Sequence, residues 1–327
     1  MTNWNVLSKY LFEFENTYGQ ELAALKYRNF NAWQIVKIPL YFNNINTVPS
    51  ASSLARRKFL GYRILKKTAG AASLLTQLIN LWVGSNFKSS NRVLFFTFAG
   101  DKLAKDEDGK YFNFLVDGFI SSGLIGNYIY AETSVNGDYK QPSRVNIDFK
   151  VDQLYTLFPL FKRMSKEELR ESEFCVNKLN EKLQSFSDKH GSLKVDMGKL
   201  RTIFSMFSAE LKMFRFFLGI CRPKLIITSE KPGTSFLAAA KSMNIPVLDV
   251  QHGIIDKHHP QYIYAEVMSN SKKDMILPDW IALFGNFHRE ILLKTGFWSD
   301  NELTILGSSR MEMNRNRYRT EGKERNI

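Results

Sequence analysis

Short apolar runs, rich in β-branched and aromatic residues, recur in the middle of the chain. The first lies at residues 92–99 (RVLFFTFA) and the second at residues 127–133 (NYIYAET). Runs of this length, bounded by turn-forming residues, are typical of buried strands. Between them, residues 109–123 carry apolar side chains at helical spacing. The order strand, helix, strand predicts a βαβ unit and therefore a parallel sheet.

The centre of the chain has a longer, helical repeat. Residues 165–186 begin with Ser165 and, three positions later, Glu168, which is the spacing of an N-terminal capping box. Residues 199–221 repeat apolar side chains every three or four positions. These patterns predict two long helices joined by a loop at residues 190–198. The apolar side chains of the second helix are expected in the core: Ile203, Phe204, Phe207, Leu211, Phe214 and Phe217.

Strand and helix patterns alternate again in the last third. Strands are predicted at residues 223–229, 245–253, 279–285 and 302–307, with shorter candidates at 143–150 and 262–268. Helices are predicted at residues 232–244, which begin with Pro and Gly, and at residues 287–296, which end with Gly. Short steps in this order predict an α/β fold with a Rossmann-like, doubly wound parallel sheet.

The change of pattern near residue 90 predicts three parts. We expect a basic, helical N-terminal region at 1–90, a Rossmann-like, acceptor-type domain at 91–310, and a polar tail or truncated linker at 311–327. The first 100 residues hold 12 Lys and Arg against 3 Glu, a balance of +9 within a total of 45 − 32 = +13. Six basic residues lie together just before an apolar run at 68–87: Arg56, Arg57, Lys58, Arg63, Lys66 and Lys67.

Composition narrows the class of protein. Of the 327 residues, 44% are hydrophobic and 26 are Phe, which suits a large core and excludes a wholly disordered chain. Two cysteines, Cys175 and Cys221, exclude a disulfide framework and a four-cysteine zinc site. No secretory leader opens the sequence, and the run at 68–87 is too rich in Ser, Thr, Gln and Asn for a membrane span. We therefore expect a cytoplasmic protein.

The positive charge predicts an anionic partner. Two interpretations of the basic cluster before residue 68 stay open. It is either the solvated face of a helical region, or a docking patch for anionic lipid that places the protein peripherally at the inner face of the plasma membrane. The run at 68–87 fits an amphipathic surface helix in both cases. Nucleic acid is not expected, because no helix-turn-helix, RNA-binding or zinc motif is present.

Polar residues gather where three of the predicted strands end. Ligands of open parallel sheets bind at the carboxyl ends of the strands, so these positions form the candidate site. Four of the five histidines lie between residues 252 and 288. The candidates are Ser229, Glu230, Lys231 and Gly233 after the first of these strands, Gln251, His252, Gly253, His258 and His259 after the second, and Gly285, Asn286 and His288 after the third.

His252 is the candidate general base, because histidine titrates near neutral pH. Gly253, which follows it, permits a tight turn and the close approach of a ligand. The alternative is a histidine that only caps the end of a strand. Glu230 either orients His252, acts as a second acid or base, or binds sugar hydroxyls. Its alternative is a helix N-terminal glutamate that the helix dipole favours.

Several common site types find little support. His258 and His259 are neighbours in one loop and cannot both present well to one ion, so no metal site is predicted. The chain has no GxSxG nucleophile elbow and no P-loop motif. The strand end FAGDK holds a single glycine, Gly100, so dinucleotide binding is only weakly supported.

Four short motifs follow one another in the last third: HG at 252–253, HPQY at 259–262, PDWIALFG at 278–285 and GSSR at 307–310. In this order they resemble the N-terminal half of bacterial surface- and capsular-polysaccharide glycosyltransferases of the GT-B type, CDP-glycerol glycerophosphotransferase-like proteins included. The resemblance covers about residues 90–310.

The resemblance implies that His252 is the catalytic base of an acceptor-holding domain, with Glu230 in support. His252 would deprotonate the hydroxyl of a glycan or lipid-linked acceptor, which attacks a sugar or polyol phosphate on a nucleotide donor. That donor is a substrate, so neither a cofactor nor a metal is implied. The implied substrate-binding residues are Ser229, Lys231, Gly233, Gln251, Gly253, His259, Tyr262, Asn286 and Arg310.

One departure from the family leaves more than one function open for this chain. GT-B proteins carry a second, donor-binding domain after the GxxR element, whereas only 17 residues follow Arg310 here. Either the sequence is a piece of a longer protein, or a partner chain supplies the donor domain, or the protein does not catalyse. The expected function is a glycosyltransferase, or its acceptor-binding half, in surface-polysaccharide biosynthesis. The alternative is a non-catalytic scaffold that binds a glycan or a partner.

Overall fold

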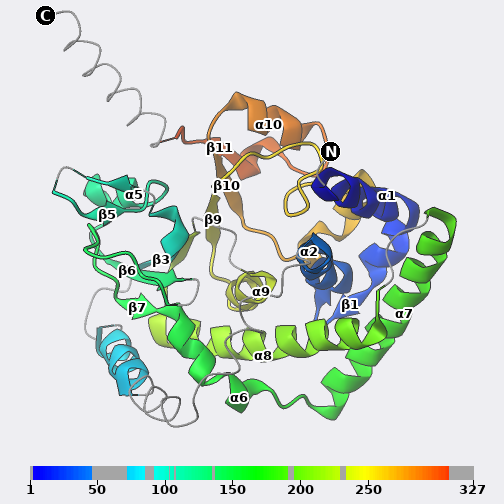
Figure 1. Ribbon diagram of the computed structural model, residues 1–327, viewed down its shortest axis with the longest axis horizontal. Coiled ribbons are helices and arrows are strands. Elements are labelled where there is room, and N and C mark those ends of the chain that lie inside the picture. The colour runs from blue at the N-terminus through cyan, green and yellow to red at the C-terminus, as the bar shows by residue number, and fades with distance from the viewer. Residues whose placement is uncertain are drawn as a thin grey trace, which may run out of the picture.

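The computed structural model describes residues 3–45, 72–84, 92–102, 104–106, 108–134, 137–190, 195–228 and 233–308. Seven parallel strands form the central sheet, and helices flank it (Figure 1). The predicted α/β, Rossmann-like fold class is therefore confirmed. The strands are β3 (Val93–Phe98), β6 (Tyr128–Thr133), β7 (Phe149–Lys150), β8 (Leu225–Thr228), β9 (Val247–Val250), β10 (Trp280–Leu283) and β11 (Leu303–Ile305).

The order of strands across the sheet is β11-β10-β9-β8-β3-β6-β7, and every neighbouring pair is parallel. From β3 the chain steps outward through β6 to β7, and then returns to build β8 to β11 on the other side of β3. The sheet is therefore doubly wound, and its order reverses between β3 and β8. In such sheets the crevice at the reversal is the usual place for a ligand.

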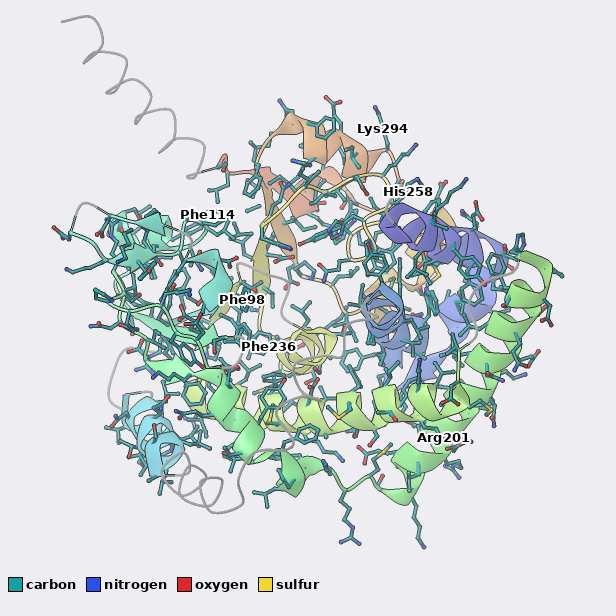
Figure 2. The ribbon with its side chains drawn as sticks, in the orientation of Figure 1. Phe98, Phe114, Arg201, Phe236, His258 and Lys294 are labelled. Atoms are coloured by element: carbon teal, nitrogen blue, oxygen red, sulfur yellow. The ribbon has the colours of Figure 1, made fainter. Side chains whose placement is uncertain are left out.

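Alternating side chains of the strands face two separate cores. Phe96 and Ile226 face the larger core, whereas Phe95 and Ile227 face the smaller one. The helices α7 (Lys166–His190), α8 (Met197–Cys221), α9 (Thr234–Ser242) and α10 (Asn286–Leu293) contribute to the larger core. Figure 2 shows Phe236 of α9 beside the sheet, where its ring centroid lies 4.1 Å from that of Phe96. In Figure 1, α8 runs below α9.

The two long central helices agree with their sequence patterns. The predicted capping box is present at the start of α7, because the backbone N of Glu168 donates to Ser165 Oγ and the backbone N of Ser165 donates to Glu168 Oε2. The side chain of Asp196 caps α8 by accepting from the backbone N of Gly198. A 3-10 helix, η3 (Val151–Thr156), and the short α6 (Phe158–Phe161) lead from β7 toward α7.

The N-terminal helices belong to the larger core. They are α1 (Asn3–Ala24) and α2 (Ala32–Ile45), joined through a tight hairpin of β1 (Lys26–Tyr27) and β2 (Phe30–Asn31). Between them, the buried Glu15 accepts from Trp33 Nε1 at 2.7 Å and pairs with Lys37 Nζ at 2.7 Å. The basic cluster at 56–67 lies outside the described residues.

The smaller core lies under residues 104–147, and here one predicted element is shorter than expected. Instead of a helix over 109–123, the chain forms β5 (Tyr111–Phe112), which pairs with β4 (Ala104–Lys105), and then α5 (Asp117–Ser121). The buried Asp117 explains the late start, because its carboxylate accepts from the backbone N of Asn113 at 2.8 Å and holds that segment in a turn. Likewise, only the last two residues of the candidate strand at 143–150 form β7.

The strand predicted at 262–268 is wrong. Residues 262–265 are irregular, and the 3-10 helix η4 (Glu266–Asp274) follows. Side chains of α1 and α2 take the backbone groups that a neighbouring strand would otherwise bind. Lys37 Nζ donates to the carbonyl of Ile263 at 2.8 Å, and the backbone N of Ala265 donates to Glu15 Oε2 at 3.2 Å.

The apolar run predicted as a surface helix is helical over residues 72–84. It lies against η3, where Gln77 Nε2 donates to Gln153 Oε1 at 2.7 Å. None of the helices within the described ranges combines the length and the apolarity needed to cross a bilayer. The last described elements are η5 (Asp300–Glu302) and β11.

Candidate functional site

The carboxyl ends of β3, β8, β9 and β10 meet at one edge of the sheet. After β3 comes η2 (Ala99–Asp101), and Gly233 stands at the N-cap of α9 after β8. The reversal of strand order therefore lies between these two turns, at the edge that the sequence predicted. Four predicted site residues lie outside the described residues, so their roles stay predictions: Ser229, Glu230, Lys231 and Arg310.

His252 lies two residues beyond β9, at this edge. Its ring is largely withdrawn from solvent, and within the described part of the chain its Nδ1 has no hydrogen-bond partner. Burial lowers the pKa of His252 below its ordinary value of 6.5, because a desolvated ring resists positive charge. The ring is therefore neutral at pH 7 and able to accept a proton.

Gln251 fixes the beginning of the loop that carries His252. Its Nε2 donates to the carbonyl of Gly253 at 2.6 Å, and its Oε1 accepts from the backbone N of Phe284 at 2.8 Å. Its own backbone N donates to the carbonyl of Ala282 at 2.9 Å. The buried amide is thus engaged within the protein, so Gln251 positions the loop and does not offer its amide to a ligand.

Gly253 has space beside it. Among the described residues, a Cβ built at this position would meet no heavy atom within 4 Å, and the backbone is not in the left-handed region. Neither the packing nor the backbone conformation of the free protein therefore requires glycine here. The open space lies next to His252, where a ligand can approach the backbone closely.

Tyr262 is buried below the same loop. Its hydroxyl donates to Asp249 Oδ2 of β9 at 2.9 Å, and its carbonyl accepts from Trp298 Nε1 at 2.7 Å. Tyr262 is 1% exposed, and in this structure it ties the loop to the strand. Its substrate-binding role stays a prediction.

The two adjacent histidines contact different elements. The ring of His258 meets Phe12 of α1 edge-on, with centroids 6.3 Å apart. The ring of His259 lies 4.9 Å from that of Tyr262. The backbone N of both histidines donates to Asp256, one to its side chain and one to its carbonyl. His259 remains half-buried beside the loop of His252.

The start of α10 completes the described part of the edge. Gly285 stands at the N-cap, and Asn286, the first residue of the helix, is exposed to solvent. His288 Nδ1 lies 3.2 Å from the carbonyl of Ile255, so this histidine holds the loop that follows His252. Asn286 is the predicted residue here whose side chain is open to a ligand.

Glu210 is a residue of this region that the sequence analysis missed. It lies in the middle of α8, where it accepts from Ser235 Oγ in the first turn of α9 at 2.6 Å and from the hydroxyl of Tyr155 at 3.2 Å. Burial raises the pKa of Glu210. The signal was present, because Glu210 is the one acidic residue in the 25 residues of α8.

A second buried cluster lies near the carboxyl ends of β3 and β6. Lys102 Nζ pairs with Glu132 Oε2 at 2.6 Å and donates to Ser143 Oγ at 2.7 Å, with both charged side chains fully buried. Nearby, Asp117 accepts from the hydroxyl of Tyr130 at 3.0 Å. Burial raises the pKa of both carboxyls, Asp117 and Glu132. The cluster connects the chain after η2 with β6 and the α5 segment. It therefore helps to hold these elements together at this edge of the sheet.

An apolar cavity of about 430 Å³ opens on the smaller-core face of the same edge. It is lined by Val250 and Phe284, from the ends of β9 and β10, together with Phe114, Phe119 and Leu124. Its volume falls within the range of small-molecule sites. Because Val250 directly precedes Gln251, an apolar group bound here would lie within a few residues of His252.

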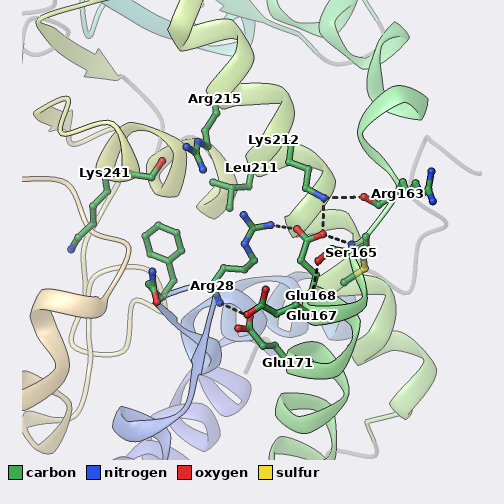
Figure 3. Close-up of a pocket in the computed structure, with 14 residues that line it drawn as sticks. Arg28, Arg163, Ser165, Glu167, Glu168, Glu171, Leu211, Lys212, Arg215 and Lys241 are labelled. Atoms are coloured by element: carbon green, nitrogen blue, oxygen red, sulfur yellow. Dashed lines mark hydrogen bonds and ion pairs between the residues drawn. The ribbon is translucent and has the colours of Figure 1, made fainter.

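Figure 3 shows a larger, charged cavity of about 1100 Å³ at the opposite end of α9, near Lys241. At its centre the buried Glu168 accepts from Arg28 Nη1, from Lys212 Nζ at 2.8 Å and from Ser208 Oγ at 2.9 Å. Both cations are thus paired with Glu168. None of the predicted site residues that the structure describes lines this cavity, and its charges join the β1–β2 turn to α7 and α8.

No group of three or more His, Cys, Asp or Glu side chains gathers as metal ligands within the described ranges. No protein-family model matches the chain, and no curated protein matches it. Any inference about the chemistry of the site therefore depends on the geometry of its residues.

Proposed function

We propose that this chain is a glycosyltransferase, or the acceptor-binding half of one, in the biosynthesis of a bacterial surface polysaccharide. The observation that carries the proposal is a neutral, desolvated His252 two residues beyond β9, at the ligand edge of a Rossmann-like sheet. The likeness of the HG, HPQY, PDWIALFG and GSSR motifs to GT-B enzymes adds support.

In the proposed reaction, His252 accepts the proton of an acceptor hydroxyl. The acceptor oxygen attacks the anomeric carbon of an activated sugar, or the phosphorus of an activated polyol phosphate, and forms a new C–O or P–O bond. The bond from that atom to the nucleotide breaks at the same time, and its electron pair leaves with the nucleotide phosphate. The reaction involves no oxidation or reduction. The activated nucleotide is consumed as a substrate.

The surroundings of His252 suit this role. A base works best when it is unprotonated at the working pH, and burial favours that state here by lowering the pKa of His252. Gln251 holds the loop from one side and His288 from the other, so the ring is positioned before a ligand arrives. The net charge of +13 favours an anionic substrate such as a phosphorylated, lipid-linked acceptor.

The proposal is tested with the purified chain and a panel of CMP-, CDP-, UDP-, GDP- and dTDP-linked donors. A ligand at about 100 times its dissociation constant stabilises the native state by roughly 2.7 kcal/mol, which a thermal melt resolves. We expect one nucleotide to raise the melting temperature and, with acceptor present, to give a transfer product detectable by mass spectrometry. No shift and no product with any donor would contradict catalysis by this chain alone.

The second candidate is a non-catalytic scaffold that binds a glycan or a partner transferase. It is favoured by Gln251 and Tyr262, two predicted ligand-binding residues whose polar groups are engaged inside the protein. A scaffold binds acceptor glycan in the same melting assay and gives no transfer product. Detection of turnover by the isolated chain excludes it.

A further inference from the structure

The apolar cavity of about 430 Å³ at the ligand edge has a lining that selects its occupant. Within the described part of the chain no charged residue lines it, and the polar side chains that line it there are those of Ser122 and Ser308. In such surroundings a phosphate is a buried charge without a partner, and a sugar ring leaves hydroxyl groups without hydrogen bonds. The cavity therefore favours a hydrocarbon group over a phosphate or a sugar ring.

The apolar lining also extends to the protein surface. Leu124 and Leu306, which are 89 and 48% exposed, line the cavity together with the buried Leu115 and Val250. A cavity of this size holds part of a small molecule. A compact ring needs only the enclosed part, whereas a hydrocarbon chain that is longer than the cavity leaves it across exposed apolar side chains. The lining therefore fits an extended hydrocarbon chain.

The alternation of side chains along β9 places His252 on the face of the sheet that carries this cavity. Leu248 and Val250 face the smaller core, and Val250 lines the cavity. The backbone N of Gln251 donates to the carbonyl of Ala282 at 2.9 Å, which continues the pairing with β10 past the end of β9. Successive side chains of a strand point to opposite faces, so His252 follows Val250 on the same face. Two residues span at most about 7 Å, so the base stands beside the cavity.

We propose that this cavity holds the hydrocarbon chain of a lipid-linked acceptor whose reacting hydroxyl group lies at His252. The inference rests on the proposed transfer function and adds the class of acceptor to it. Because the hydroxyl group and the hydrocarbon chain belong to one molecule and bind close together, the reacting sugar is near the lipid. The protein therefore acts at an early step, on a short lipid-linked acceptor, and not on the far end of a long glycan.

The test compares three uncharged probes by isothermal titration calorimetry of the full chain: n-octyl β-glucoside below its micelle concentration, methyl β-glucoside and phenyl β-glucoside. We expect the octyl compound to bind at least about tenfold more tightly than the methyl compound, because its additional methylene groups leave water. It should also shift the NMR signal of His252, assigned with His252→Gln. Equal affinities for the octyl and methyl compounds, or an unmoved His252 signal, would overturn the proposal. Tighter binding of the phenyl compound would overturn it as well, in favour of a ring.

A glycine in the wall of the cavity allows it to be filled without removing a packed side chain. Gly118 of α5 (Asp117–Ser121) lines the cavity, and a Cβ built there meets no heavy atom of the described residues within 4 Å. Gly118→Leu should therefore lower the affinity for octyl glucoside at least about tenfold. The matched control is Gly219→Leu in α8, where a Cβ has the same open space and which does not line the cavity. Circular dichroism verifies that both variants are folded, and equal binding of octyl glucoside by the two would contradict the proposal.

The binding test separates this inference from the transfer function. Octyl glucoside that binds in the cavity, with no transfer product from any nucleotide donor, would support the hydrocarbon site while the transfer function fails. Transfer to methyl and octyl glycosides with equal kcat/KM, and no binding of octyl glucoside in the cavity, would overturn the inference and leave the transfer function standing.

Discussion

Burial controls the protonation state of His252, and this gives the site a measurable signature. The ring lies beside a loop closed by Gln251 and His288, and desolvation is the cause of its lowered pKa. Protonation of a base whose pKa is lowered by folding makes the folded protein less stable. The contribution of His252 to the free energy of unfolding is therefore fully present above the unfolded pKa of about 6.5, and it is lost as the pH falls through the folded pKa.

We predict that His252 titrates below pH 6.5. Any rate that depends on it as a base stays level from pH 8 down to about 6.5 and falls only at lower pH. Histidine NMR signals of the wild type, assigned with His252→Gln, measure this pKa directly. The outcome that contradicts the prediction is a midpoint at or above 6.5.

A substitution at Gly253 distinguishes an effect on folding from an effect on ligand binding. A Cβ at this position meets no atom of the described residues within 4 Å, so Gly253→Ala should change the free energy of unfolding by less than about 1 kcal/mol. We expect the same substitution to lower ligand affinity or transfer rate, because the methyl group enters the space beside His252. Urea unfolding and the ligand melting assay give the two values, and equal ligand binding by the variant would remove the proposed close approach.

At the scale of elements, α1 and α2 act as a clamp on the chain that follows the site. Lys37 and Glu15 pair inside the core and bind the backbone at Ile263 and Ala265. Gln34 of α2 does the same at Ile276, where its Nε2 donates to the carbonyl at 2.7 Å. The loop of His252 is therefore tied to its strand and, further along the chain, to the N-terminal helices.

We predict that Lys37→Met is strongly destabilising. Burial lowers the pKa of Lys37, and removal of this cation leaves Glu15 buried without its charge partner, which typically costs about 3–5 kcal/mol. The control is Lys9→Met in the exposed Lys9–Glu13 pair of the same helix as Glu15, which should cost less than about 1 kcal/mol. Urea unfolding compares the two. Similar losses for both would mean that the buried pair does not clamp the core.

Local sequence patterns correctly predicted those helices and strands whose backbone hydrogen bonds stay within one helix or one sheet. The strands β3 and β6 and the helix α7, with its capping box, belong to this group. The strand expected at 262–268 failed because its backbone partners are side chains more than 200 residues earlier, and no local pattern reports them. The bonds of Gln251 within the protein were not visible in the sequence for a related reason, since its amide partner Phe284 follows another strand, β10.

At the scale of the whole molecule, the order of strands places the candidate residues. The sequence predicted strands that end in polar residues, and the parallel sheet brings β8, β9 and β10 to one edge beside the reversal at β3. That reversal, and the packing of α1 and α2 into the same core as the sheet, are long-range features that the sequence pattern does not contain. The helix at 72–84 shows the same limit, because only packing reveals that Leu74 and Leu81 are on its buried side.

The two cysteines report on the integrity of the larger core. Cys175 of α7 and Cys221 of α8 are fully buried, and burial raises the pKa of the Cys175 thiol to about 12. We predict that a thiol reagent modifies neither in the native protein, at rates at least about a thousandfold below those in denaturant, because reaction requires opening of the core. Mass spectrometry after timed labelling measures this. Rapid native labelling of either residue would show that the two long helices are not packed as described.

The most direct test of the central claim compares the transfer rates of the wild type, His252→Ala and His190→Ala, with the donor and acceptor that the binding panel identifies. His190 lies in the last turn of α7, stacked on Phe186, and serves as the control for loss of a histidine. If His252 is the base at the acceptor edge, His252→Ala lowers kcat about 100- to 10,000-fold with an unchanged melting temperature, whereas His190→Ala keeps a rate near that of the wild type. A folded His252→Ala variant that transfers at the wild-type rate would contradict the assignment of the site.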